Sequence, residues 1–99
     1  MAPEPPEVDL GQIRARLDDV DRRLVQVLSE RGRLIAQVVE YKRARGMPVV
    51  DRGREDDMLN RIEKLATAEH LDPRVARTVL RAVIDAFTLL EVEQLGPDH

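Results

Sequence analysis

The sequence lacks cysteine and tryptophan and has one tyrosine and one phenylalanine. Without cysteine, disulfide frameworks and thiolate–metal sites are excluded. The scarcity of aromatics and a net charge of −3 argue against a nucleic-acid reader, which stacks bases on aromatic rings and carries a basic surface. No run of 18 apolar residues could span a membrane, and residues 1–8 show no signal-peptide pattern. We therefore expect a soluble cytoplasmic protein with no metal site.

The apolar residues that are present follow a helical 3/4 spacing over more than four heptads. A long helix is predicted from Asp9, where Gln12 completes a capping-box pattern, to Arg45, where Gly46 ends it. Such a helix is roughly 55 Å long. Because a chain of 99 residues cannot cover it, we expect its apolar seam to pack against a second copy. The seam comprises Leu10, Ile13, Leu17, Val20, Leu24, Val27, Leu34, Val38 and Tyr41.

Two shorter helices are predicted after the long one. Asp51 is the expected N-cap of the first, which ends around residues 68–70, and Asp72-Pro73 opens the second, which runs to about Gln94. No strand pattern is present. The sequence thus predicts an all-α fold of one long and two shorter helices, with a single domain over residues 9–95 and tails at 1–8 and 96–99. The expected inward faces contain Met58, Leu59, Ile62, Leu65, Val75, Val79, Leu80, Val83, Ile84, Phe87 and Leu90.

Several charged residues interrupt these apolar faces. Arg31 occupies the heptad position that leucine holds earlier in the helix, Lys42 lies one turn beyond Val38, and Arg14 borders the seam near its start. An unpaired buried charge costs several kcal/mol, on the order of 3–5. On the later helices, Arg54 and Glu55 are predicted to extend the inward face before Met58, and Glu91 to extend that of Ile84 and Phe87.

Taken singly, each of these charges can be explained without a ligand. Long cationic side chains snorkel past apolar surface, and Glu91 could form a structural salt bridge. As a set, four inward cations facing two acids leave excess positive charge in a small volume. Arginine binds carboxylates in a bidentate manner, so the pattern predicts a pocket for a small dicarboxylate.

The ordered motifs of this chain resemble those of the all-helical chorismate mutases. The resemblance covers residues 10 to about 95 and rests on the spacing of Arg14, Arg31 and Lys42, then P-V-V-D-R-G-R-E-D-D-M-L at 48–59 and H-L-D-P-R-V at 70–75. It implies an intertwined homodimer of three-helix protomers, in which each site draws residues from both chains. It also implies the rearrangement of chorismate to prephenate in aromatic amino-acid biosynthesis, a one-step pericyclic reaction that needs no cofactor.

The resemblance implies a role for each matching cation. Arg14 of the partner chain and Arg31 would clamp the two substrate carboxylates, and Lys42 would donate to the breaking ether oxygen. Arg54 would add a further cation beside the enolpyruvyl group. Arg52 competes for that role, but we predict that it lies outside the helix and off the inward face.

The remaining implied roles fall on acids and on one aromatic residue. Glu55, helped by Asp51, would accept a hydrogen bond from the C4 hydroxyl of the substrate. Glu91 stands where a glutamine often donates to the ether oxygen; only a protonated carboxylic acid can donate, so we expect activity to fall as pH rises. Phe87 replaces a small hydroxyl residue and would narrow the site.

Other functions remain open on the same sequence. Phe87 slightly favours an isochorismate pyruvate-lyase, whereas Asp51 and Glu55 favour the chorismate mutase. A 4-amino-4-deoxychorismate mutase is the third candidate. A helical dimerisation module would explain the heptads but not the inward charges. A DNA-binding helix is disfavoured, because we interpret Arg74, Arg77 and Arg81 as a solvated face. Dependence on a partner enzyme of the same pathway is a further possibility.

Overall fold

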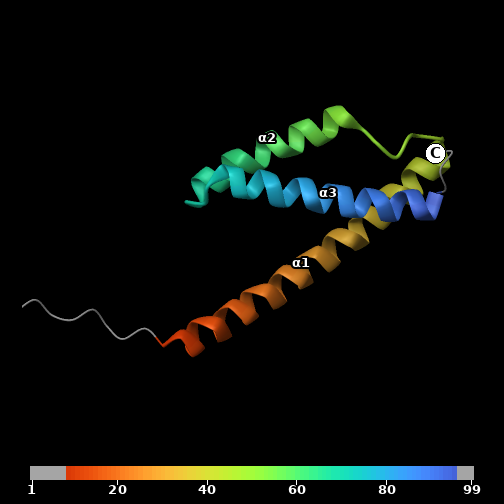
Figure 1. Cartoon of the computed structure of the whole chain (residues 1–99). Helices are drawn as coiled ribbons and strands as arrows, with labels where there is room; N and C mark the ends of the chain where they lie inside the picture. Colours follow the sequence, from red (N-terminus) through yellow and green to blue (C-terminus); the bar gives the residue numbers. More distant parts are fainter. Residues whose placement is uncertain (1–8, 96–99) are drawn as a thin grey trace, which may run out of the picture. The chain divides into compact units, whose positions relative to one another are not determined.

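The computed structural model describes residues 9–95 and contains three α-helices in that range (Figure 1). Helix α1 comprises Leu10–Arg45, α2 comprises Arg52–Ala68 and α3 comprises Pro73–Leu95. This confirms the predicted all-α class and the order of one long and two shorter helices. The predicted tails at 1–8 and 96–99 lie outside the described residues.

Helix α1 begins and ends at the predicted residues. The Asp9 carboxylate accepts a hydrogen bond from the Gly11 backbone N–H at 2.8 Å, which satisfies one of the free donors at the helix start. At the other end, Gly46 has φ of +61°, the left-handed conformation that glycine adopts without strain. The chain then leaves the helix toward Pro48.

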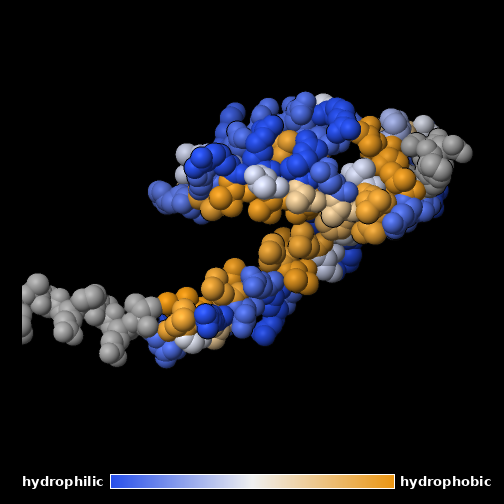
Figure 2. Space-filling view, viewed as in Figure 1, coloured by the Kyte–Doolittle hydropathy of each residue, from blue (hydrophilic) through white to orange (hydrophobic). Residues whose placement is uncertain are grey.

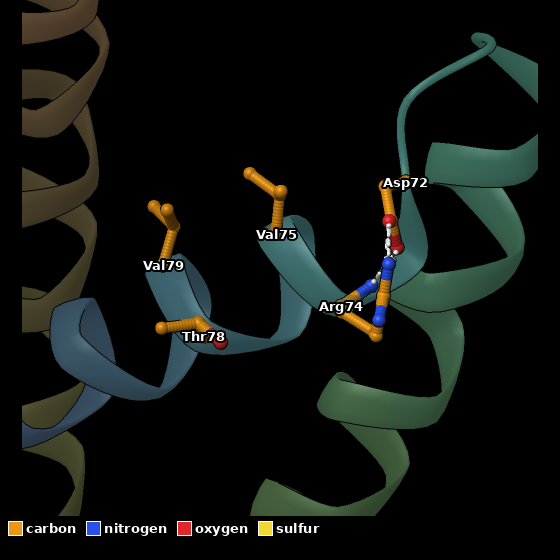
Figure 3. A pocket seen from close by; sticks show the side chains of 5 residues that line it. All are labelled: Asp72, Arg74, Val75, Thr78 and Val79. Carbon is orange, nitrogen blue, oxygen red and sulfur yellow. Dashed lines mark hydrogen bonds and ion pairs between the residues drawn. The ribbon is translucent and has the colours of Figure 1, made fainter.

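The junctions around α2 and α3 also follow local signals. Asp51 caps α2 by accepting from the Arg54 backbone N–H at 3.0 Å. Asp72 accepts from the Arg74 backbone at 2.9 Å and from the Arg74 guanidinium at 2.7 Å, contacts visible in Figure 3. The side-chain hydrogen bond from Arg74 is the main cause that lowers the pKa of Asp72. Pro73 then fits the first helical position, where no N–H is needed.

Within residues 9–95, the chain divides into two units, one that ends at Arg33 and one that begins at Leu34. The described part of the first unit is the helical segment from Leu10 to Arg33. In the second unit, α2 runs back alongside α3 (Figure 1). The predicted single domain over residues 9–95 stays a prediction.

The core of the second unit is aliphatic and small. Val39 of α1 and Val49 of the following loop are buried together, and Ile35 and Val92 pack against them. Leu59 and Ala66 of α2 and Ala76 and Ile84 of α3 are also buried. This packing fixes the last turns of α1, the loop at 46–51 and the two shorter helices as the frame for the charged residues described below.

Much of the predicted apolar seam is exposed in the single chain. The exposed fractions of Leu10, Leu17 and Leu24 are 55%, 54% and 50%, and those of Val75 and Val79 on α3 are 48% and 51%. Figure 2 shows apolar side chains gathered along α1 and along one face of α3. A shallow cavity of about 430 Å³ lies at the start of α3 beside Val75 and Val79 (Figure 3). No helix within residues 9–95 has the length and apolar character needed to cross a membrane.

Candidate active site

Lys42 and Glu91 form an ion pair in the second unit. The Lys42 ammonium lies 3.7 Å from Glu91 Oε2 and donates a hydrogen bond to the Val49 carbonyl at 2.7 Å. Both side chains are largely withdrawn from solvent, with exposed fractions of 15% and 8%. The aliphatic packing of Val39, Val49 and Val92 around them explains how a lysine in the last turns of α1 reaches an acid near the end of α3. The predicted inward position of both residues is therefore confirmed.

Glu55 is the second buried acid, and α3 supplies its main partner. Arg81 donates a hydrogen bond to Glu55 Oε1 at 2.7 Å, and Arg52 lies 3.6 Å from the same oxygen. Asp85, one turn after Arg81, contacts the same guanidinium at 3.4 Å. The hydrogen bond with Glu55 is the largest cause that raises the pKa of Arg81, so this side chain stays charged. Two arginines thus balance one buried carboxylate.

A cavity of about 290 Å³ adjoins this cluster. Arg52 and Glu55 of α2 and Asp85 and Thr88 of α3 supply its polar lining, and Val50, Leu89 and Val92 supply the apolar part. Charged and apolar groups on one concave surface suit a small polar ligand with a hydrocarbon ring. The lining also shows that Glu55 is accessible from a hollow, although most of its surface is covered.

Two expectations about the start of α2 are wrong. Arg52 is the first residue of the helix and contacts Glu55, because the predicted N-cap at Asp51 places Arg52 in the first turn. Arg54 is exposed and does not extend the inward face, which begins with Glu55 and continues to Leu59 one turn later. The Asp51 carboxylate is engaged as the helix cap.

The other predicted residues are Arg14, Arg31 and Phe87. Arg14 and Arg31 belong to the first unit, where Arg14 is exposed and Arg31 is partly buried. Phe87 of α3 is partly buried, one turn before Glu91. The second unit therefore contains Lys42, Glu91 and Glu55, whereas Arg14 and Arg31, the predicted clamp for the two carboxylates, belong to the first unit.

Arg81 is the residue that sequence reasoning missed. Arg77 and Arg81 are spaced four residues apart, the usual pattern of a solvated helix face, and Arg77 does pair with Glu63 near the surface at 3.1 Å. The acids Glu55 and Glu63 on α2 meet these arginines in reverse order along the chain. The first of these acids pairs with the later arginine of α3, and the second pairs with the earlier one, as expected for two antiparallel helices. This order of charges in the sequence is the signal that could have identified the ion pairs.

Comparison with known families gives one match over most of the chain. The sequence profile of the family described as chorismate mutase type II matches residues 13–92. The matched range contains α2 whole and most of α1 and α3, and it includes every charged residue discussed above from Arg14 to Glu91.

Among individual proteins, the chorismate mutase of Methanocaldococcus jannaschii is 28% identical over 86 residues, which cover 87% of each chain. The T-protein of Enterobacter agglomerans is 36% identical over 77% of this chain but only 20% of its own length. The bifunctional chorismate mutase/prephenate dehydratase of Escherichia coli K12 is 31% identical over 86% of this chain and 22% of its own. The chain thus spans most of one relative and about a fifth of the length of the other two.

Proposed function

Since this chain belongs to the chorismate mutase type II family, we propose that it is an isomerase that converts chorismate to prephenate. The observation that carries the proposal is a cation held inside the fold. The side chain of Lys42 is withdrawn from solvent, although an ammonium group is strongly hydrated in water. Within residues 9–95, the Oε2 atom of its partner Glu91 accepts no hydrogen bond. Such a site gains from a polar ligand.

The reaction breaks an ether C–O bond and forms a C–C bond in one step. It needs a compact substrate conformer and stabilisation of the negative charge that develops on the ether oxygen. We assign the donor role to Lys42. Its ammonium is already held by the Val49 carbonyl, so it needs little rearrangement to reach the transition state. We assign the second donation to Glu91 in its protonated form, in which it no longer pairs with Lys42 as a carboxylate.

The substrate carboxylates require further cations. We assign them to Arg31 and to Arg14 of a second copy, which makes the active form an intertwined homodimer with shared sites. The proposal is supported by the apolar seam of α1, where Leu10, Leu17 and Leu24 are about half exposed or more. A monomer rarely leaves so large an apolar surface in contact with water.

The ring hydroxyl at C4 sets the choice among related substrates. We assign its recognition to Glu55, supported by Asp51 at the helix cap. A further cation near the enolpyruvyl group is assigned to Arg54 by its match to the family motif, although its side chain is exposed in the single chain. Phe87 narrows the space beside Glu91. A buried acceptor at Glu55 favours a substrate with a donor at C4, which supports chorismate over isochorismate.

The test is an assay of substrate consumption. Purified wild type is offered chorismate, isochorismate and 4-amino-4-deoxychorismate in separate reactions, beside Arg31→Ala and Lys42→Ala. We expect prephenate from chorismate with wild type and a strong loss with both variants. Untouched chorismate would refute the proposal, and pyruvate released from isochorismate would replace it with the lyase.

Two wider expectations accompany this function. Relatives that carry a chorismate mutase and a prephenate dehydratase in one protein support a partnership with another enzyme of the same pathway. The cytoplasmic location expected from the sequence stays a prediction.

A further inference from the structure

The buried carboxylate of Glu55 needs a compensating positive charge that a neutral substrate hydroxyl does not supply. Only 8% of the residue is exposed, and a buried carboxylate is costly without compensating charge. The ligand hydroxyl is neutral and cannot supply that charge. The compensation therefore has to come from the protein and has to leave one carboxylate oxygen available.

The contacts of Glu55 meet this requirement. Arg81 Nη1 at 2.7 Å and Arg52 Nη1 at 3.6 Å both lie against Oε1. Neither described ion pair involves Oε2. One oxygen is therefore committed to the guanidinium groups, while the other can accept from a donor in the adjacent cavity, whose lining includes Glu55.

The two arginines differ in how firmly they hold the acid. The Arg52 side chain is 79% exposed and its distance to Oε1 exceeds hydrogen-bonding range, so solvent screens it. Arg81 is 36% exposed, makes a short hydrogen bond to Glu55 through Nη1, and the same nitrogen also contacts Asp85 at 3.4 Å. Arg81 is the partner that can set the orientation of the carboxylate.

We propose that Arg81 is a positioning residue that holds Glu55 Oε1 and so directs Oε2 toward the ring hydroxyl of the substrate. This inference rests on the proposed function, in which Glu55 recognises that hydroxyl. Arg81 acts through Glu55 and touches no reacting atom. It thereby sets the preference for substrates with a hydrogen-bond donor on the ring.

The test compares Arg81→Ala and Arg81→Lys with a matched control, Arg77→Ala. Arg77 lies one turn earlier on α3 and also bridges to α2, but its pair with Glu63 is more exposed. Each protein is assayed with chorismate and with its 4-O-methyl ether, which cannot donate from that oxygen. Circular dichroism and thermal unfolding confirm that the variants are folded.

With chorismate, we expect Arg81→Ala to lower kcat/KM roughly 10- to 100-fold, as when a hydrogen bond to a charged group is lost. The loss falls mainly on KM, because the hydroxyl does not react and is bound equally in the ground and transition states. Arg81→Lys recovers most of it, and Arg77→Ala stays within about twofold of wild type. With the methyl ether, Arg81→Ala and wild type differ by less than about twofold.

Equal losses on the two substrates would overturn the inference, because they would indicate a general structural role. An Arg81→Ala enzyme that matches Arg77→Ala on chorismate would overturn it as well, while leaving the mutase function intact. The wild-type rate is a separate readout: wild type that fails to consume chorismate refutes both the function and the inference.

Discussion

The Lys42 ammonium is held between the Val49 carbonyl, at 2.7 Å, and Glu91 Oε2, at 3.7 Å. Its position is therefore set by three separate segments, namely the end of α1, the loop before α2 and the end of α3. A donor fixed in this way before the substrate arrives can stabilise a developing charge without rearranging. The same contacts make the lysine part of the fold.

Replacement of Lys42 should affect the chemical step more than substrate binding. We expect Lys42→Ala to lower kcat by about 100- to 1,000-fold, the usual effect of removing one preorganised donor. The measurement is initial-rate kinetics with chorismate. A kcat within a few-fold of wild type would exclude Lys42 as the donor.

Lys42→Ala also leaves the Glu91 carboxylate buried without its ion-pair partner. The double variant Lys42→Ala/Glu91→Gln serves as the control, since a neutral amide does not need a cation. We expect the double variant to unfold at a higher temperature than Lys42→Ala and to remain as inactive. Recovered activity in the double variant would show that the single substitution acted through folding.

Glu91 should make catalysis depend on pH. Only the protonated acid can donate to the ether oxygen, and its charged form repels the negative charge that develops there, so kcat should fall as pH rises. Glu91→Gln keeps a donor at every pH and should flatten the profile. The measurement is kcat against pH for both proteins; parallel profiles would remove Glu91 from the mechanism.

Local sequence signals were sufficient for the helix boundaries. Gly46 before Pro48 and Asp72 before Pro73 act through backbone geometry and a cap within two or three residues, so they need no knowledge of the fold. The inward positions of Lys42, Glu55 and Glu91 were predictable for a related reason. Each interrupts an apolar helical period, and the period identifies the buried face.

Residues outside that period were predicted less well. Arg54 was placed inward because it precedes Met58 by one turn, but the first turn of α2 buries only Glu55. The partnership of Arg81 with Glu55 joins residues 26 positions apart. It depends on how α2 and α3 are paired, which hydrophobic periodicity within each helix does not specify.

The turn at Gly46 provides a test of stability that does not depend on catalysis. Gly46 has φ of +61° and open space around its Cα, so an added methyl group meets only backbone strain. We expect Gly46→Ala to lower the free energy of unfolding by about 1–2 kcal/mol. The measurement is chemical denaturation followed by circular dichroism.

Gly53→Ala is the matched control for this substitution. Gly53 lies in the first turn of α2, and an added Cβ would be 3.6 Å from the Asp51 carboxylate, an ordinary contact. We expect a gain of roughly 0.5 kcal/mol, since alanine loses less backbone entropy than glycine in a helix. A loss for Gly53→Ala equal to that for Gly46→Ala would indicate that the strain argument is wrong.

A shared active site can be tested by mixing two inactive variants. Arg14→Ala and Lys42→Ala should each be nearly inactive alone, because every site would lack one of the two cations. In a heterodimer, the site built from the Lys42-containing chain and the Arg14-containing chain is intact, whereas the other site lacks both cations.

Random exchange of subunits should therefore restore about a quarter of the wild-type specific activity. Sedimentation measurements on the mixture should show a dimer throughout. If the mixture stays as inactive as its components after complete exchange, Arg14 acts within its own chain or has no part in the site.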